Sequence, residues 1–283
     1  MTPAQAQAFL DRHGLAPSRE RGQNFLHDDR LARKLVATAG VRPGDAVLEI
    51  GTGLGILTRA LAPAARRVRT VEIDGGLVRG LRAEGVLPDG VELVHGDALE
   101  LDLAAQVGEL GRPVRVVANL PYSVASPLLR RFLDHADVLS GWGVMVQREV
   151  AQRLRAAPGS KAYGSLSVVH QWLVEVGPAL DLHGQCFYPV PRVVSTFVAM
   201  WPRDEPLVDR GDRGELARME RIVRAGFAHR RKTVVNSLKR AAGIEPVRAE
   251  SVLAAHGLDT RVRAEALSPT AWQKVSRDLS DGG

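Results

Sequence analysis

The chain has 283 residues, a formal net charge of +6 at pH 7 and a single cysteine, Cys186. This length accommodates one good-sized domain and a smaller one, with a core that buries about three-quarters of the unfolded surface. One cysteine excludes an intrachain disulfide, and because no charged-then-apolar leader is present we expect a reducing, cytoplasmic setting. Charged residues interrupt every apolar run before the roughly 18 residues that a membrane-spanning helix needs, so we expect no membrane segment.

The positive charge is concentrated in one segment. Between Arg218 and Arg240 eight basic residues stand against one acidic residue, Glu220, so this segment carries +7 while the whole chain carries +6. The pattern predicts a polyanionic partner, although a basic helix face can also be merely solvated. The basic residues are Arg218, Arg221, Arg224, Arg230, Arg231, Lys232, Lys239 and Arg240.

Up to about Pro202, β-rich apolar runs alternate with helical periodicity, which predicts an α/β fold with a parallel sheet wrapped by helices. Two of the earlier helices are expected at 31–39 and 127–133. The seven expected strands are 46–50, 68–73, 91–94, 114–118, 143–146, a stretch within 167–176, and 195–200.

After Trp201 the pattern changes to a helical one. The polar residues 203–206 indicate a linker into an all-helical tail. We therefore expect a first domain at 1–202, with an N-terminal extension at 1–20, and a small C-terminal helical domain at 203–283. The tail helices are expected at 214–227, 230–241, 247–256 and 270–279.

A glycine-rich loop follows the first expected strand. The loop reads Gly51-Thr-Gly-Leu-Gly55 and precedes a helix start at Ile56, so its glycines let a ligand touch the backbone. A dinucleotide-binding fingerprint would need a third glycine where Ile56 stands, which argues against a nicotinamide cofactor. No Gly-Lys-Ser/Thr follows, which excludes a Walker loop.

Two carboxylates end the next two strands. Glu72 stands where an acidic side chain accepts hydrogen bonds from both ribose hydroxyls of a nucleoside, and Asp97 could accept from the amine of an adenine. The alternative is that such residues only cap the following helix, and Asp74 is the candidate for that role. The order of the two acids behind a glycine loop favours ligand binding.

The tetrapeptide Asn119-Leu120-Pro121-Tyr122, directly behind the apolar run 114–118, has the chemistry to hold the exocyclic amine of a flat base. The Asn119 side-chain carbonyl and a main-chain carbonyl beside Pro121 would each accept one amine hydrogen, while the Tyr122 ring stacks on the base. The alternative interpretation is a strand followed by an ordinary Asn-x-Pro turn.

Together these residues resemble the class I S-adenosylmethionine-dependent methyltransferases, and more closely the ribosomal RNA adenine N6-dimethyltransferase family. The resemblance covers roughly residues 19–240, and its strength is the colinear order of motifs that are weak one by one. Besides the glycine loop, Glu72, Gly96-Asp97-Ala98 and the tetrapeptide, the matching motifs are Arg21–Leu26, Val146–Val150, Ser160–Gly164, Phe187–Pro191, Arg230–Thr233 and Asn236–Leu238.

The resemblance implies a Rossmann-like fold with S-adenosylmethionine as cofactor and no metal. Asn24 and Leu26 would close over the cofactor's methionine end through backbone or side-chain contacts, Glu72 would hold the ribose and Asp97 the adenine. The implied cofactor-binding residues are Asn24, Leu26, Gly51, Gly53, Glu72, Asp97 and Asn119.

The same resemblance implies that a flipped adenine lies between two aromatic rings. Phe187 matches the position that stacks on the base opposite Tyr122, although an isolated buried phenylalanine is more often an ordinary core residue. The implied catalytic residues are Asn119, Leu120, Pro121, Tyr122 and Phe187.

Three positions depart from the family's usual pattern. Thr52 stands where proline is common, Ser123 where asparagine is more familiar, and His229 replaces a common glutamine. None of them removes a group assigned to chemistry.

The implied activity is transfer of two methyl groups to each of two adjacent adenosines near the 3′ end of 16S ribosomal RNA. The expected partner is the small ribosomal subunit or its precursor, bound through Arg224, Arg230, Arg231 and Lys232, and we expect a monomer. The alternatives are a macrolide-resistance type methylase of large-subunit RNA, a non-catalytic RNA-binding assembly factor and an adenine-specific DNA methylase. Leu120 and the extended basic tail favour the small-subunit activity.

Overall fold

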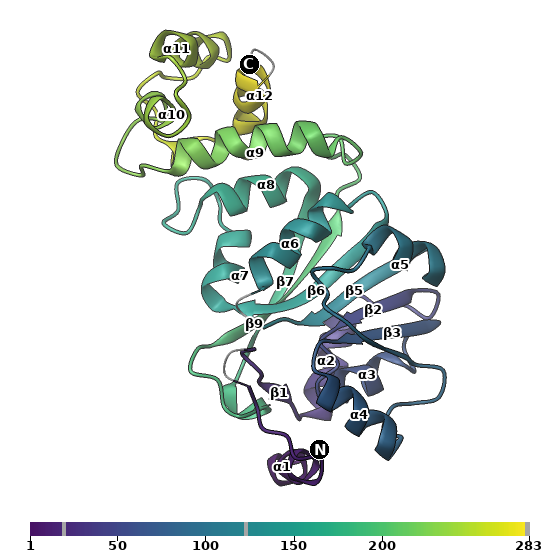
Figure 1. Ribbon diagram of the computed structural model, residues 1–283. Coiled ribbons are helices and arrows are strands. Elements are labelled where there is room, and N and C mark those ends of the chain that lie inside the picture. The colour runs from purple at the N-terminus through teal and green to yellow at the C-terminus, as the bar shows by residue number, and fades with distance from the viewer. Residues whose placement is uncertain (19–20, 122–123, 281–283) are drawn as a thin grey trace. The chain divides into compact units, whose positions relative to one another are not determined.

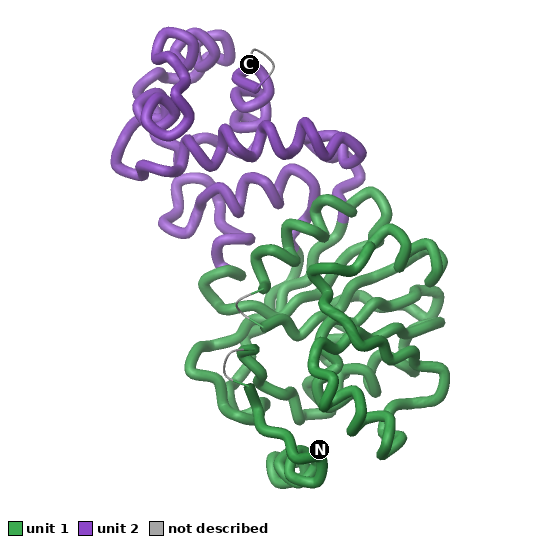
Figure 2. The backbone as a smooth tube through the Cα atoms, in the orientation of Figure 1, with its two compact units in different colours: residues 1–151, 177–201 green, residues 152–176, 202–283 purple. Residues whose placement is uncertain are grey.

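The computed structural model describes residues 1–18, 21–121 and 124–280 (Figure 1). The chain divides into two compact units, residues 1–151 with 177–201 and residues 152–176 with 202–283 (Figure 2). The expected change near residue 202 is therefore present, but the expectation that all of 1–202 forms one domain was wrong. Residues 152–176 join the second unit because the helix they contain, α8 (Ser165–Leu173), packs on α9 (Arg213–Phe227) and α12 (Pro269–Ser280).

The first unit is built around a seven-stranded sheet, as predicted. The strand order is β4-β3-β2-β5-β6-β9-β7, in which β4, β3, β2, β5 and β6 run parallel to one another while β9 pairs antiparallel with β6. From β2 the chain continues to β3 and β4 on one side of the sheet and later to β5 and β6 on the other side. Ligands of open α/β sheets bind at such a switch point, beyond the carboxyl ends of the strands. The strands are β2 (Ala46–Ile50), β3 (Arg67–Glu72), β4 (Glu92–His95), β5 (Val114–Asn119), β6 (Leu139–Gln147), β7 (Val174–Leu182) and β9 (Ser195–Pro202).

The central strand β2 is buried along its entire length, which explains its nearly continuous apolar sequence. Its last residue, Ile50, lies level with Val71 of β3 and Ala118 of β5. The residues that follow these three strands therefore emerge at the same edge of the sheet.

Helices connect the strands of the first unit, and short acidic residues begin several of them. Asp28, Asp74 and Asp102 accept hydrogen bonds from the first free backbone N–H groups of α2, α4 and α5. The prediction that Asp74 is a helix cap is confirmed. The helices are α1 (Pro3–Arg12), α2 (Asp29–Thr38), α3 (Ile56–Leu61), α4 (Gly75–Glu84), α5 (Leu103–Leu110), α6 (Ala125–Asp134) and α7 (Arg148–Leu154).

The strand expected within 167–176 was misplaced. This stretch is mostly helix α8, and β7 begins only at Val174. The helix is buried on nearly every side, so its sequence lacks the polar face that distinguishes a helix from a buried strand.

A two-stranded ribbon joins segments that are far apart in the sequence. β1 (Phe25–Leu26) pairs antiparallel with β8 (Phe187–Tyr188), with Leu26 opposite Phe187. The ribbon follows the 3-10 turn at Gly184–Cys186 and was not predicted. It places the N-terminal motif beside the Phe-Tyr-Pro motif.

The second unit contains the four expected tail helices, α9, α10 (Val234–Ala242), α11 (Pro246–Ala255) and α12, with a 3-10 turn at Ala264–Ala266. α10 begins at Val234 and not at residue 230, because the Thr233 hydroxyl accepts a hydrogen bond from the Asn236 N–H and caps the helix there. Trp272 is fully buried beneath α9, and its indole N–H donates to the Ala264 carbonyl at 3.1 Å.

No helix among the described residues is both long and apolar enough to span a membrane.

We predict that Gly226→Ala destabilises the second unit. A Cβ at Gly226 would lie 2.2 Å from the Trp272 ring, so the indole must move, at a cost of about 1–3 kcal/mol in the free energy of unfolding. Gly108→Ala on α5 is the control, because nothing lies within 4 Å of its added methyl group. It should be neutral or stabilising by up to about 1 kcal/mol. Urea unfolding followed by circular dichroism measures both, and equal stabilities of the two variants would contradict the packing argument.

Candidate functional site

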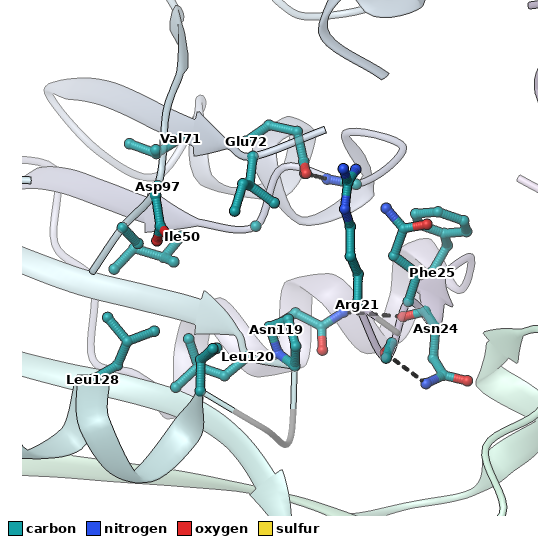
Figure 3. Close-up of a pocket in the computed structure, with 18 of the residues that line it drawn as sticks. Arg21, Asn24, Phe25, Ile50, Val71, Glu72, Asp97, Asn119, Leu120 and Leu128 are labelled. Carbon is teal, nitrogen blue, oxygen red and sulfur yellow. Dashed lines mark hydrogen bonds between the residues drawn. The ribbon is translucent and has the colours of Figure 1, made fainter. Parts of the chain in front are cut away.

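A cavity of about 260 Å³ lies at the edge of the sheet where β2, β3 and β5 end (Figure 3). Apolar side chains such as Ile50, Val71 and Leu128 form part of its wall, and carboxyl and amide groups enter it from the strand ends. It brings together nine of the residues predicted from the sequence, namely Asn24, Gly51, Gly53, Glu72, Asp97, Asn119, Leu120, Pro121 and Phe187.

Among the described residues predicted for the cofactor or the chemistry, Leu26 does not line it. Leu26 is 5% exposed and its side chain belongs to the apolar core under α2 and α3, so only its backbone is left for the expected contact with the cofactor, which stays a prediction. Its place is explained by strand alternation, since Phe25 lines the cavity and the next side chain points to the other face. Tyr122 lies outside the described residues, as does Ser123.

The glycine loop lets two strand ends approach closely. Gly51 has φ +86°, and a Cβ added there would lie 3.1 Å from the Asn119 carbonyl oxygen. Gly53 has φ +56°, and its added Cβ would lie 3.3 Å from the Phe25 ring. A side chain at either position would require a strained backbone and would fill the floor of the cavity.

Glu72 is held in place by two backbone amides. The Gly53 N–H donates to Oε2 and the Asp74 N–H donates to Oε1, both at 2.9 Å. The side chain is buried, and this burial raises the pKa of Glu72 although the two amides act in the opposite direction. Each carboxyl oxygen retains capacity to accept a hydroxyl, which suits binding of a vicinal diol.

Asp97 follows β4 and combines a local backbone contact with a place at the cavity. Its Oδ1 accepts a hydrogen bond from the Leu99 N–H at 2.8 Å, as in a local turn, and the residue also lines the cavity. In Figure 3 its side chain lies beside Ile50 of β2, on the opposite side of the cavity from Asn24.

Asn119 ends β5 at the centre of the site. Its Nδ2 donates to the backbone carbonyl of Asn24 at 3.3 Å, which ties the strand end to the N-terminal segment (Figure 3). Because Asn119 is one residue beyond the Ala118–Ile50 pair, its backbone passes directly beside Gly51. Leu120, which follows it, is 2% exposed and packs into the wall.

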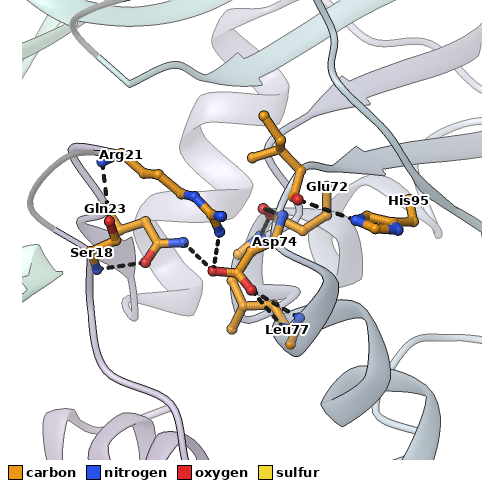
Figure 4. A network of polar contacts seen from close by, with 10 residues as sticks. Ser18, Arg21, Gln23, Glu72, Asp74, Leu77 and His95 are labelled. Atoms are coloured by element: carbon orange, nitrogen blue, oxygen red, sulfur yellow. Dashed lines mark hydrogen bonds and ion pairs between the residues drawn. The ribbon is translucent and has the colours of Figure 1, made fainter.

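A polar network, missed by the sequence reasoning, fastens the N-terminal segment beside the cavity (Figure 4). Arg21 Nη1 and Gln23 Nε2 donate to Asp74 Oδ2 at 2.7 and 3.0 Å, while Asp74 Oδ1 caps α4. Both side chains also line the cavity. The only signal in the sequence was their place in the Arg21–Leu26 motif, since the contact spans more than 50 residues.

Ile73 is another residue that the sequence reasoning did not single out. It follows Glu72, lines the cavity and is 47% exposed, which is unusual for a large apolar side chain. It offers a flat aromatic ligand an apolar surface beside the carboxylate. Its position directly after the strand-end acid was the available signal.

The basic residues between Arg218 and Arg240 are all exposed. Arg224 forms an i,i+4 ion pair with Glu220 at 2.6 Å, and Arg230 Nη2 donates to the Lys161 carbonyl at 2.8 Å. Arg231 and Lys232 lie in the connection between α9 and α10. All of these residues belong to the second unit. Within the part of the chain that the structure describes, no three His, Cys, Asp or Glu side chains form a group suited to a metal ion.

We predict that Asp74→Ala loosens the N-terminal segment. Asp102→Ala is the matched control, because each substitution removes a helix cap worth about 1 kcal/mol but only Asp74 also binds Arg21 and Gln23. Hydrogen exchange of the 23–26 amides should be faster in Asp74→Ala than in Asp102→Ala. Equal exchange rates would show that the network does not hold the segment.

Comparison with known proteins gives one consistent result. Residues 17–281 match the family described as "Ribosomal RNA adenine dimethylase". "Ribosomal RNA small subunit methyltransferase A" of Rhodospirillum rubrum is 43% identical, covering 96% of this chain and 91% of that protein. The protein of the same name from Moorella thermoacetica is 40% identical over 98% of each chain.

Solved structures show the same fold. A dimethyladenosine transferase from Plasmodium falciparum superposes with a TM-score of 0.71 at 22% identity, covering 89% of this chain and 95% of that one. The 23S rRNA methyltransferase ErmE superposes with a TM-score of 0.66 at 27% identity, covering 90% and 99%. The predicted Rossmann-like methyltransferase fold is thus confirmed, and the chain belongs to the ribosomal RNA adenine dimethylase family.

Proposed function

We propose that the protein transfers methyl groups from S-adenosylmethionine to N6 of two adjacent adenosines near the 3′ end of 16S ribosomal RNA. The observation that carries the proposal is the position of Asn119, whose backbone passes beside Gly51 in the cavity that also contains Glu72 and Asp97. An amine-binding residue and a nucleoside-binding set thus share one site. The names of the relatives support the small subunit as the source of the RNA.

The residues of the cavity fit an adenosyl cofactor. Glu72, fixed by the Gly53 and Asp74 amides, suits the ribose diol, and Asp97 suits the adenine amine with Ile73 against the ring. Gly51 and Gly53 leave room for the ligand against the backbone. Bound there, the cofactor supplies an electrophilic methyl group on a positively charged sulfur.

The protein's part in the reaction is to prepare the acceptor amine. The adenine nitrogen is a poor nucleophile because its lone pair is delocalised into the ring. The Asn119 side-chain carbonyl and a main-chain carbonyl of the tetrapeptide would each accept one amine hydrogen and leave the lone pair free. Since the Pro121 carbonyl already accepts the Val124 N–H at 3.1 Å, the Leu120 carbonyl is the better candidate. Transfer then depends on positioning, without a dedicated general base.

Phe187 would hold the face of the target base. The residue lines the cavity, while its ring is 2% exposed and packs in the same apolar cluster as Leu26, its partner across the β1–β8 ribbon, so stacking requires the ring to turn towards the cavity. Stacking on one ring stabilises a flipped base by about 1–3 kcal/mol, which offsets part of the cost of unstacking it from the RNA. Tyr122 would supply the second ring.

The described residues that line the cavity all belong to the first unit. We also propose that the enzyme acts as a monomer, in the cytoplasm where the small subunit is assembled.

We predict that Asn119→Ala lowers methyl transfer at least about a hundredfold, because a polarising group at the reacting atom is lost. The assay incubates under-methylated small subunits with cofactor and measures dimethyladenosine by mass spectrometry with nucleotide mapping. Circular dichroism should show an unchanged fold. An unchanged yield from the variant would overturn the assignment.

Parallel assays separate the alternatives. Large subunits methylated in preference to small ones would favour an activity like that named for ErmE. Absence of heat on titration with S-adenosylmethionine would favour a non-catalytic RNA-binding protein.

We also propose that Arg224, Arg230, Arg231 and Lys232 position the RNA through its phosphates and carry no sequence information. Arg231 and Lys232 are the best residues to substitute, because both are exposed in the connection between α9 and α10. Arg224 is less suitable because it forms an ion pair with Glu220.

The double variant Arg231→Glu, Lys232→Glu should bind small subunits more weakly and with a salt dependence reduced by about one ion per lost phosphate contact. The matched control is Arg33→Glu, Lys34→Glu, an exposed basic pair on α2, which should change neither quantity. Affinity is measured by filter binding at several salt concentrations. If the first variant binds like the wild type at every concentration, the segment is only a solvated face.

A further inference from the structure

Glu49 is a fully buried carboxyl group beneath the glycine loop that the proposed chemistry does not use. It lies on β2, two residues before Gly51, and is 0% exposed. Its neighbours across the sheet are Thr70 of β3 and Val117 of β5. It does not line the cavity, so a direct contact with the cofactor does not explain it.

The partners of this carboxyl do not compensate a negative charge. Oε2 lies 2.6 Å from the Thr58 hydroxyl of α3, and Oε1 has no hydrogen-bond partner among the described residues. The groups packed around it are the hydroxyls of Thr58 and Thr70 and the apolar Val117, and the charged group that acts on it is another acid, Glu72. Within the part of the chain that the structure describes, no basic side chain acts on it.

An ionised carboxylate in this place would leave a buried charge without a cation and with one oxygen unpaired. Burial raises the pKa of Glu49 from its ordinary value of 4.5 to about 8, and Glu72 acts in the same direction, while the two hydroxyls oppose them. The Thr58 hydroxyl donates to Oε2 when the carboxyl is ionised. As a neutral acid, Glu49 would reverse this bond by donating its proton from Oε2 to the Thr58 oxygen, and Oε1 would be an uncharged carbonyl oxygen. A neutral carboxyl group suits a buried position between two hydroxyls and an apolar side chain.

Thr52, which stands where proline is common in the family, contacts Thr70, the residue opposite Glu49 on β3. Thr52 is 4% exposed, and its hydroxyl lies 2.6 Å from that of Thr70. The loop is thus attached to β3 through Thr52, and α3 is attached to β2 through Thr58 and Glu49. Glu72, the next acid, is bonded to the loop at Gly53.

We propose that Glu49 is a positioning residue that carries a proton at neutral pH and, in that form, keeps the glycine loop and the start of α3 packed for cofactor binding. Ionisation would place a second negative charge near Glu72 and disturb the bond between Glu72 and Gly53. This inference rests on the proposed function only in identifying the ligand of the loop.

A protonated Glu49 determines whether the stability of the folded protein rises or falls with pH. Between pH 4.5 and about 8 the folded protein retains a proton on Glu49 that the unfolded chain has lost. The free energy of unfolding falls with rising pH wherever the folded state binds more protons than the unfolded state. Glu49 therefore lowers the stability of the protein progressively across this window, and its effect is complete above pH 8. Glu49→Gln, which mimics the neutral acid, removes this contribution.

The binding experiment uses the full-length protein and S-adenosylhomocysteine, whose uncharged sulfur avoids a direct attraction to Glu49. Calorimetric affinity of the wild type should fall about tenfold from pH 7 to pH 9, because a group with a pKa of about 8 is then largely ionised. Glu49→Gln should bind like the wild type at pH 7 and lose little by pH 9. Glu49→Ala should bind more weakly at both pH values.

The control is Glu250→Gln on α11, an exposed acid that should retain the wild-type pH dependence. A Glu49→Gln variant that keeps the wild-type decrease, or that binds as weakly as Glu49→Ala at pH 7, would overturn the proposal.

A second measurement is independent of ligand. Urea unfolding from pH 5 to pH 9 should show a decrease in stability in the wild type that is smaller in Glu49→Gln, and infrared difference spectra should show a protonated carboxyl in the wild type at pH 7. Absence of that band, or equal pH slopes, would contradict a neutral Glu49. Failure of the wild type to bind the ligand at any pH would instead contradict the proposed function.

Discussion

The close approach of two parallel strand ends, β2 at Gly51 and β5 at Asn119, is the constraint on which the site depends. A Cβ at Gly51 would lie 3.1 Å from the Asn119 carbonyl, so these backbones meet only because residue 51 has no side chain. In the proposed function the glycine loop belongs to the cofactor side of the cavity and Asn119 to the acceptor side. On that proposal their contact would set how far a methyl group must travel, and in-line transfer is sensitive to such distances.

Segments distant in sequence complete the site from the other side. The β1–β8 ribbon places Phe25 and Phe187 at the cavity, and Asp74 uses its two oxygens to cap α4 and to hold Arg21 and Gln23. Glu72, the acid proposed to bind the ribose, and the helix cap Asp74 are linked through the backbone, since the Asp74 N–H donates to Glu72. The proposed cofactor binding and the ordering of the N-terminal segment would therefore share the same few groups.

Strong local signals predicted most of the first unit. β2 was predicted at its observed bounds because a buried central strand has an apolar sequence bounded by a glycine loop. The error at α8 arose because a helix buried on all sides has no polar face, and this same burial draws residues 152–176 into the second unit. The motif did not reveal that the Leu26 side chain joins the core while Phe25 lines the cavity, because it does not show which of two successive strand residues faces the cavity.

The sequence by itself determined the family, six of the seven strands of the sheet and the chemical groups at the ends of the first ones, because these follow from local patterns and colinear motifs. Only the tertiary structure decided which groups meet and in what surroundings. The Arg21–Asp74 pair and the β1–β8 ribbon depend on contacts between distant segments. The burial of Glu49, with one oxygen unpaired, depends on the packing of β2, β3 and α3 around it. Burial and neighbours set the charge state of an acid, and neither can be read from its position in a motif.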